Sequence, residues 1–255
     1  MQRVGSISSL WRYPISSVGG ESLSSVKVGV TGIVGDRRFC LIDLETGEIA
    51  QPETSVRWRP ALFLQSSIDE NGVTTICLPN GAVYCLSDPY LRAMLQSHFG
   101  FAVGVGRHHP PTLESDLDLP IIERRYAVAP LHLLTSASIG KLQTMCAEKI
   151  DERRFRPSLF VDTGGDDGFL ENGWESCRFK IGDVQLTFAE HTKRCGMTFI
   201  AQPDLNENPE ILRTIVRQNQ RKFGIYCEVG GAGTLSVGMD VCCLQSPSDV
   251  DGPQQ

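Results

Sequence analysis

The sequence predicts a β-rich α+β protein, in which a β-barrel core with peripheral helices follows an N-terminal β-barrel-like domain. Short runs that alternate polar and apolar residues recur along the chain, hairpin-type turn pairs separate several of them, and few segments have a helical pattern. The 255 residues are enough for one large β-rich domain or two smaller ones with a proper core.

Two domains and a tail are predicted from the changes in composition. Residues 1–110 form the N-terminal β-rich domain, residues 120–246 form the second domain, and residues 247–255 form a flexible tail rich in Pro, Asp and Gln. A polar, proline-containing stretch over residues 107–120 marks a soft boundary between the domains.

Hairpins organise the N-terminal domain. Residues 4–11 and 26–30 alternate as half-buried strands do, and the glycine-containing loop over residues 13–21 lies between them. Asparagine and glycine tolerate the positive φ angles of tight turns, and such pairs suggest a curled sheet or barrel. Turns are predicted at residues 44–47, after a strand over residues 37–43, and at Asn71-Gly72 and Asn80-Gly81.

Three helices are predicted from apolar spacing and end signals. Asp88 is the expected N-cap of the first helix, and Gly100 its stop. The second helix is expected from Thr135 to about Glu148. The third opens at Asn208-Pro209 and ends at cations that suit a helix C-terminus.

The remaining strands belong to the second domain. Residues 179–188 form a clean alternating strand, and another strand is expected from Met197. The glycine run over residues 230–233 lacks the context of a dinucleotide-binding loop, so it is interpreted as a hairpin turn between the last two strands, residues 223–229 and 234–244.

The charge distribution excludes a general nucleic-acid binder. The net charge is −6, whereas such proteins carry a basic stripe. Cations are nevertheless locally dense, and several that converge on one pocket would suit a small multiply charged anion. No stretch is long and apolar enough for a membrane helix, and no signal peptide is recognised, so a cytoplasmic protein without membrane contact is expected.

Nine cysteines include no C-x-x-C pair, and the five histidines show no zinc-ligand spacing with them. No zinc, iron–sulfur, haem or flavin motif is therefore predicted. One thiol stands apart, because Cys195 follows Lys193 and Arg194 at the end of an apolar strand. Nearby positive charge favours the thiolate, which binds metals and attacks electrophiles. The alternative is that Cys195 is a small buried hydrophobe at a strand end.

Five short motifs follow one another in the second half of the chain: Arg154-Phe155-Arg156-Pro157, Ile181-Gly182-Asp183, Lys193-Arg194-Cys195, Phe223-Gly224-Ile225-Tyr226 and Leu235-Ser236-Val237-Gly238. Their order resembles that of MOSC domains, the C-terminal domains of molybdenum cofactor sulfurases. Through Tyr13-Pro14-Ile15-Ser16-Ser17, Gly20-Glu21 and Gly35-Asp36-Arg37, the first hundred residues resemble the β-barrel domain that often precedes a MOSC domain.

This resemblance implies a MOSC β-barrel core and a molybdopterin-type cofactor. In relatives such as the amidoxime-reducing components, the cysteine of the Arg-Cys pair is a molybdenum ligand, a role that falls on Cys195 here. The cofactor's pterin and phosphate would be held by four arginines: Arg37, Arg154, Arg156 and Arg194.

Ser16 departs from the family pattern, because relatives commonly have lysine at this position of the phosphate site. A hydroxyl can hydrogen-bond phosphate but brings no charge. Lys193 stands where some relatives have a small polar residue, and this extra cation is expected to compensate for the missing lysine.

Three functions are compatible with these residues. The first is a molybdenum-dependent oxidoreductase that reduces N-hydroxylated or N-oxygenated small molecules with electrons from a separate donor protein. The second is a carrier that hands molybdenum cofactor, or sulfur held as a persulfide on Cys195, to an acceptor protein. The third is a metal-free descendant that uses Cys195 otherwise or binds only a small anion.

Overall fold

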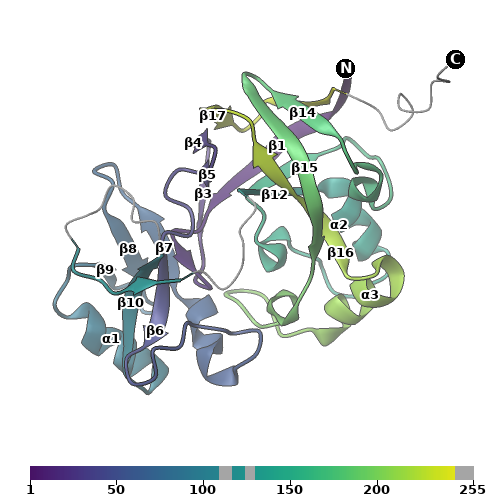
Figure 1. Cartoon of the computed structure of the whole chain (residues 1–255). Coiled ribbons are helices and arrows are strands. Elements are labelled where there is room, and N and C mark those ends of the chain that lie inside the picture. Colours follow the sequence, from purple (N-terminus) through teal and green to yellow (C-terminus); the bar gives the residue numbers. More distant parts are fainter. Residues whose placement is uncertain (109–116, 124–129, 245–255) are drawn as a thin grey trace, which may run out of the picture.

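A barrel of seven strands forms the larger half of the molecule (Figure 1). The computed structural model describes residues 1–108, 117–123 and 130–244. Its largest sheet has the order β13-β12-β16-β15-β14-β18-β1-β3, and a further pairing of β13 with β1 closes the barrel. The strands of this sheet are β1 (Gln2–Arg12), β3 (Glu21–Leu23), β12 (Leu131–Thr135), β13 (Leu159–Asp162), β14 (Arg178–Ile181), β15 (Val184–Lys193), β16 (Lys222–Val229) and β18 (Asp240–Cys243).

Three smaller sheets complete the strand inventory of the described residues. One has the order β11-β10-β6-β2, another β7-β8-β9, and the third β17-β4-β5. Their strands are β2 (Ile15–Ser16), β4 (Ser25–Gly29), β5 (Gly32–Ile33), β6 (Phe39–Asp43), β7 (Gln65–Ile68), β8 (Thr74–Cys77), β9 (Val83–Cys85), β10 (Val103–His108), β11 (Ile121–Ile122) and β17 (Gly233–Ser236).

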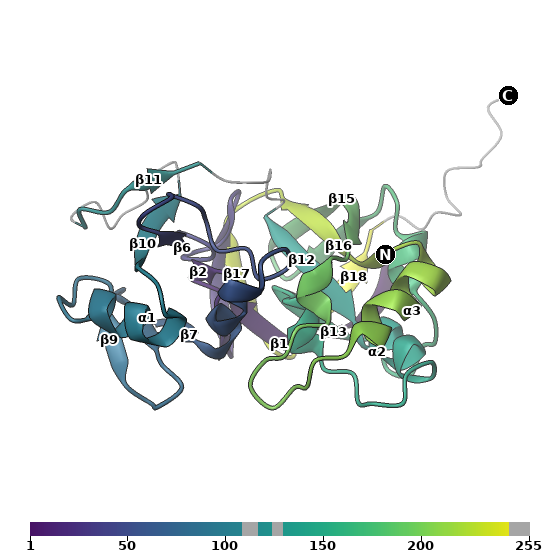
Figure 2. The same cartoon turned by 90° about the horizontal axis from the view of Figure 1, so that it is seen from below.

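Helices lie outside the sheets (Figures 1 and 2). α1 accompanies the N-terminal sheets, whereas α2 and α3 lie against the barrel and cover a separate apolar cluster that includes Phe155 and Phe223. None of the helices within the described ranges is both long and apolar enough to cross a membrane. The α-helices are α1 (Leu91–Phe99), α2 (Ser136–Gln143) and α3 (Pro209–Asn219), and the 3₁₀ helices are η1 (Val56–Phe63), η2 (Glu152–Phe155), η3 (Leu170–Gly173) and η4 (Gly196–Thr198).

The predicted β-rich α+β class is confirmed, and so are several local signals. The Asn71-Gly72 and Asn80-Gly81 turns join β7 to β8 and β8 to β9, and both glycines have positive φ. Thr135 caps α2 by accepting a hydrogen bond from the Ser138 amide, and Asn208 caps α3 in the same way. Gly100 ends α1 in the left-handed conformation.

Other boundaries differ from the predictions. The strand expected from Arg37 begins at Phe39, because Arg37 has a φ of 46° that no strand residue adopts. The second helix ends at Gln143 rather than near Glu148. The N-cap of α1 is Tyr90. Asp88 lies two residues earlier, and its carboxylate accepts a hydrogen bond from the Tyr90 amide.

Two predictions in the second domain were wrong. Met197 lies in the 3₁₀ helix η4, not in a strand. The glycine run over residues 230–233 is not a hairpin turn, because β16 and β17 belong to different sheets: β17 pairs with β4, more than two hundred residues earlier in the chain. Alternation of polar and apolar residues identifies a strand but does not determine which other strand it pairs with.

β1 belongs to the barrel, although it comes from the predicted N-terminal domain. It pairs with β13 and β18 on its two sides, and Figure 1 shows it running from the N-terminal sheets into the barrel. The division into domains at residues 110 and 120 stays a prediction. The flexible tail predicted over residues 247–255 lies outside the described residues.

Removal of a β1 side chain should destabilise the whole barrel. Leu10 is fully buried and lies opposite Leu159 of β13 and Leu23 of β3. We expect Leu10→Ala to lower the free energy of unfolding by about 2–5 kcal/mol, measured by urea denaturation, because a cavity remains in the core. Val30 is 69% exposed, so Val30→Ala should change the free energy of unfolding by less than about 0.5 kcal/mol. Equal effects of the two substitutions would contradict this role of β1.

Candidate functional site

Two guanidinium groups face the ring of Tyr13, the residue that follows β1. The Arg156 guanidinium carbon lies 4.1 Å from the ring centroid and that of Arg37 lies 5.4 Å from it. Both arginines have positive φ, Arg156 at the end of η2 and Arg37 just before β6. The buried aromatic ring therefore gathers cations from both halves of the chain.

Arg194 adds a third cation at the end of β15. Its guanidinium is buried and donates a hydrogen bond of 2.8 Å to the carbonyl oxygen of Phe155, in the turn that carries Arg156. Arg221 fixes the Arg194 backbone, because it donates two hydrogen bonds of 3.1 Å to the Arg194 carbonyl oxygen. The next residue, Cys195, has an exposed thiol. An accessible thiol thus adjoins a buried positive charge.

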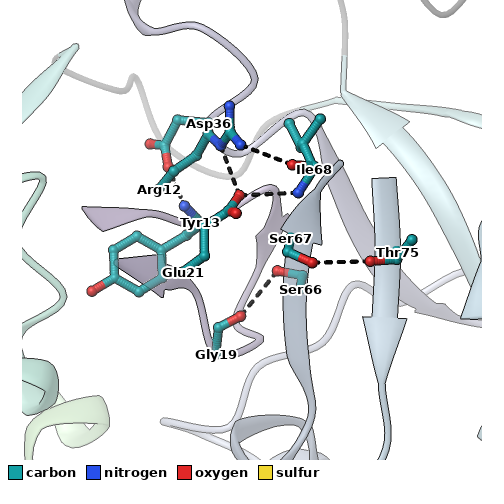
Figure 3. A network of polar contacts seen from close by, with 9 residues as sticks. All are labelled: Arg12, Tyr13, Gly19, Glu21, Asp36, Ser66, Ser67, Ile68 and Thr75. Atoms are coloured by element: carbon teal, nitrogen blue, oxygen red, sulfur yellow. Dashed lines mark hydrogen bonds and ion pairs between the residues drawn. The ribbon is translucent and has the colours of Figure 1, made fainter. Parts of the chain in front are cut away.

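Asp36 anchors the N-terminal side of the site (Figure 3). Its carboxylate accepts a hydrogen bond of 2.7 Å from the Tyr13 amide and forms an ion pair with Arg37. Arg12 and Glu21 form a second ion pair beside it, and Glu21 also accepts from the Ile68 amide of β7. In Figure 3 the Tyr13 ring points away from these polar contacts. The contacts hold the Tyr13 backbone, and the ring remains accessible to the two arginines.

Positive charge exceeds negative charge in this cluster. In the described part of the chain, Asp36 is the one carboxylate within ion-pair distance of the guanidinium groups of Arg37, Arg156 and Arg194. Burial, together with the charges of Arg37 and Arg194, lowers the pKa of Arg156 to about 10, while Tyr13 and Asp36 oppose this shift. Burial also lowers the pKa of Arg194. All three remain charged at neutral pH, so an anion would relieve their repulsion.

Two titratable neighbours of the arginines, Tyr13 and His132, stay neutral at neutral pH. Burial raises the pKa of Tyr13, and burial together with the charge of Arg194 lowers the pKa of His132 to about 3. His132 lies in β12 and contacts the ring of Tyr226 in β16, with 5.5 Å between the centroids. Tyr13 and His132 therefore add no charge to the cluster.

Two buried donors fit the polar group of a bound anion. The Tyr13 hydroxyl and Nε of Arg194 are buried and have no hydrogen-bond partner among the described residues. Buried polar groups normally have partners. Both belong to the cationic cluster, so the site matches the phosphate-bearing end of a molybdopterin-type cofactor, and the exposed Cys195 offers a soft sulfur ligand for its metal.

The other predicted site residues are Arg154, Ser16 and Lys193. Arg154 is buried and donates to the carbonyl oxygens of Ile200 (3.4 Å) and Asn206 (2.6 Å), so it fixes a loop. Ser16 lies in β2, with its hydroxyl 3.3 Å from Nε2 of His108. Lys193 is exposed on β15, where side chains alternate and Arg194 is buried. Their roles in cofactor binding stay predictions.

The loop before η1 reaches the thiol region. An added Cβ on Gly196 would lie 2.8 Å from the carbonyl oxygen of Glu53 and 3.4 Å from its Cα. The residue after Cys195 must therefore be glycine for the N-terminal half to approach this closely. The site is built from both halves of the chain.

Sequence reasoning missed Tyr13, Asp36, His132 and Tyr226 as members of the site. Three of them stand in the quoted motifs, in Tyr-Pro-Ile, Gly-Asp-Arg and Phe-Gly-Ile-Tyr, and Asp36 directly precedes Arg37, which was predicted for its charge. His132 has no local signal, because a histidine in an apolar strand is typical of a protein core. Over the described ranges, no group of three or more His, Cys, Asp or Glu side chains could hold a metal ion by itself.

Two family models match this chain. The family model described as MOSC domain matches residues 112–242. The chain belongs to the MOSC domain family. A second model, described as MOSC N-terminal beta barrel domain, matches residues 4–84. The resemblance predicted from the short motifs is therefore confirmed over both halves of the chain.

Relatives of this MOSC protein include reductase components and sulfurases. It is 25% identical to mitochondrial amidoxime reducing component 2 of Bos taurus over 93% of this chain and 83% of that one. It is 24% identical to mitochondrial amidoxime-reducing component 1 of Homo sapiens, over 96% of this chain and 84% of that one. A 35% identical match to molybdenum cofactor sulfurase of Drosophila yakuba covers 37% of this chain and 12% of that protein.

The contact between Gly196 and Glu53 can be tested by one methyl group. We expect Gly196→Ala to lower the free energy of unfolding by about 1–3 kcal/mol, because the backbone of residue 53 must move away. Gly231 has open space around it, so Gly231→Ala should change the free energy by less than about 1 kcal/mol. Thermal unfolding of the two variants measures the difference, and an unchanged Gly196→Ala protein would disprove the close approach.

Burial of His132 should make stability depend on pH. The unfolded chain takes up a proton on this residue as the pH falls below about 6.5, whereas the pKa of His132 in the folded protein is about 3, so that the folded protein takes up this proton only at much lower pH. The free energy of unfolding should therefore fall on acidification across this range, by up to about 1.4 kcal/mol per pH unit. Urea titrations at about pH 7, 6 and 5 should show a shallower fall in His132→Gln. Parallel profiles would contradict the neutral state of His132.

Proposed function

We propose that this MOSC protein binds molybdenum cofactor at the cluster of Arg37, Arg156 and Arg194 and reduces N-oxygenated small molecules. The observation that carries the proposal is the placement of three guanidinium groups, matched by one carboxylate, next to the exposed Cys195 thiol. Membership of the MOSC family and the similarity to amidoxime reducing components support it.

In this proposal each residue has a defined task. The guanidinium groups of Arg156 and Arg194 neutralise the cofactor's anionic end, and Arg37 does so while Asp36 holds it in place. The Tyr13 hydroxyl and Nε of Arg194 donate the hydrogen bonds that they lack within the described residues. Cys195, which follows Arg194, supplies a thiolate ligand to the metal. Bound cofactor supplies oxygen-atom transfer chemistry.

The proposed reaction needs an electron source. Reduction of an N-hydroxylated group breaks the N–O bond, takes up two electrons and two protons, and releases water. No flavin or iron–sulfur motif is recognised in the sequence. The electrons are therefore proposed to come from a separate donor protein.

A carrier role is the second candidate. The match to molybdenum cofactor sulfurase and the exposure of Cys195 favour it, because an accessible thiol can hold sulfur as a persulfide or release a bound cofactor to an acceptor. Turnover separates the two functions. The reductase consumes many equivalents of an N-hydroxylated amidine when a donor is supplied, whereas a carrier transfers at most one equivalent of cofactor or sulfur.

Metal and pterin analysis tests the cofactor site directly. Protein purified from a host that makes molybdenum cofactor should contain near-stoichiometric molybdenum and pterin. Cys195→Ala should lose molybdenum, and Arg156→Gln should lower the affinity for the cofactor by about tenfold or more, because a charge-assisted hydrogen bond contributes about 1.5–3 kcal/mol. Arg92 is exposed on α1, so Arg92→Gln is the matched control. Wild-type protein without molybdenum or pterin would refute the proposal.

A further inference from the structure

A groove lies beside Phe199, the residue that follows η4. It encloses about 530 Å³ between η1 and α3, within the size range of small-molecule sites. Its apolar lining comes from Phe199, Pro209, Leu212 and Val216. Val216 is 44% exposed, so the groove presents apolar surface to solvent.

η4 links this groove to Cys195. The Thr198 amide donates to the Cys195 carbonyl oxygen, and the Phe199 amide donates to that of Gly196, both at 3.1 Å. Cys195 and Phe199 thus bracket one 3₁₀ turn, which rises about 2 Å per residue. The groove wall at Phe199 and the thiol of Cys195 therefore belong to the two ends of one short turn.

Arg154 holds the wall of the groove. Its guanidinium donates to the carbonyl oxygens of Ile200 and Asn206, at the two ends of the loop between Phe199 and Glu207. The Asn208 amide closes the same loop by donating to the Phe199 carbonyl oxygen at 2.9 Å. The lining residues are therefore fixed before any ligand arrives.

The rim of the groove carries one cation more than it has carboxylates. Arg59 and Glu207 form an ion pair of 2.7 Å across the groove. Arg213 and Arg217 share Glu210, which lies 2.5 Å from the first and 3.9 Å from the second. Arg217 is the less engaged of the two, with 66% of its side chain exposed. The excess positive charge at the rim therefore favours a ligand with an anionic group.

We propose that the groove binds a small amphipathic monoanion, with an apolar ring on Phe199, Leu212 and Val216 and a carboxylate at Arg217. This inference rests on the proposed function. In that function, the groove binds the non-reacting part of the substrate, and the reactive group of the same substrate lies at the Cys195 site. It narrows the substrate class to N-oxygenated compounds that carry an apolar body and one acidic group.

Two probes of the same shape and different charge test the groove. Isothermal titration of the purified protein with 2-naphthoate and with uncharged 2-naphthalenemethanol should show tighter binding of 2-naphthoate. Arg217→Gln should weaken 2-naphthoate binding by about two- to fivefold, as expected for an exposed charge pair, and leave the neutral probe unchanged. Val216→Asp should weaken both probes, with the acid affected more. Arg92→Gln is the control for lost surface charge.

Failure has a clear form. Equal affinity for the two probes, an unchanged 2-naphthoate affinity in Arg217→Gln, or no binding by wild-type protein at about 10 mM probe would overturn the inference. Molybdenum and pterin contents, measured on the same preparations, separate it from the proposed function. If the protein binds 2-naphthoate but acquires no cofactor, the inference about the groove holds and the proposed function is refuted. If it acquires cofactor but does not bind 2-naphthoate, the proposed function holds and the inference about the groove is refuted.

Discussion

The barrel can close only because β1, the first strand of the chain, lies between β13 and β18. A sheet that ended at β13 and β18 would expose two unpaired edges, and β1 satisfies both. The same strand pairs with β3 and ends at Tyr13, so closure of the barrel also delivers Tyr13 to the cationic cluster. Stability and site formation therefore depend on one strand.

The cationic cluster follows from this closure. The ends of β1, η2 and β15 and the turn before β6 meet at one place, and each contributes one member of the set formed by Tyr13, Arg156, Arg194 and Arg37. None of the three arginines could be held there by local structure alone, because burial and mutual repulsion oppose their charges. Packing of the barrel and the anchor at Asp36 impose the arrangement, and an anion would stabilise it.

The four arginines make different contacts. Arg37 and Arg156 face the Tyr13 ring, and Arg194 donates to the Phe155 carbonyl oxygen beside Arg156. Arg154 instead donates to the carbonyl oxygens of Ile200 and Asn206, in the loop that borders the groove between η1 and α3. The proposed cofactor belongs to the first region, and the proposed apolar ligand body belongs to the second.

Sequence alone determined the β-rich class, the hairpin turns, the caps at Thr135 and Asn208, and the family, because periodicity, turn chemistry and ordered motifs are local properties. It also selected Cys195 and the arginine clusters by charge. Only the tertiary structure decided that β17 pairs with β4, that Arg154 donates to the carbonyl oxygens of Ile200 and Asn206, and that Tyr13 is the centre of the cluster. Strand partners and side-chain neighbours depend on packing between distant segments, which short-range patterns do not encode.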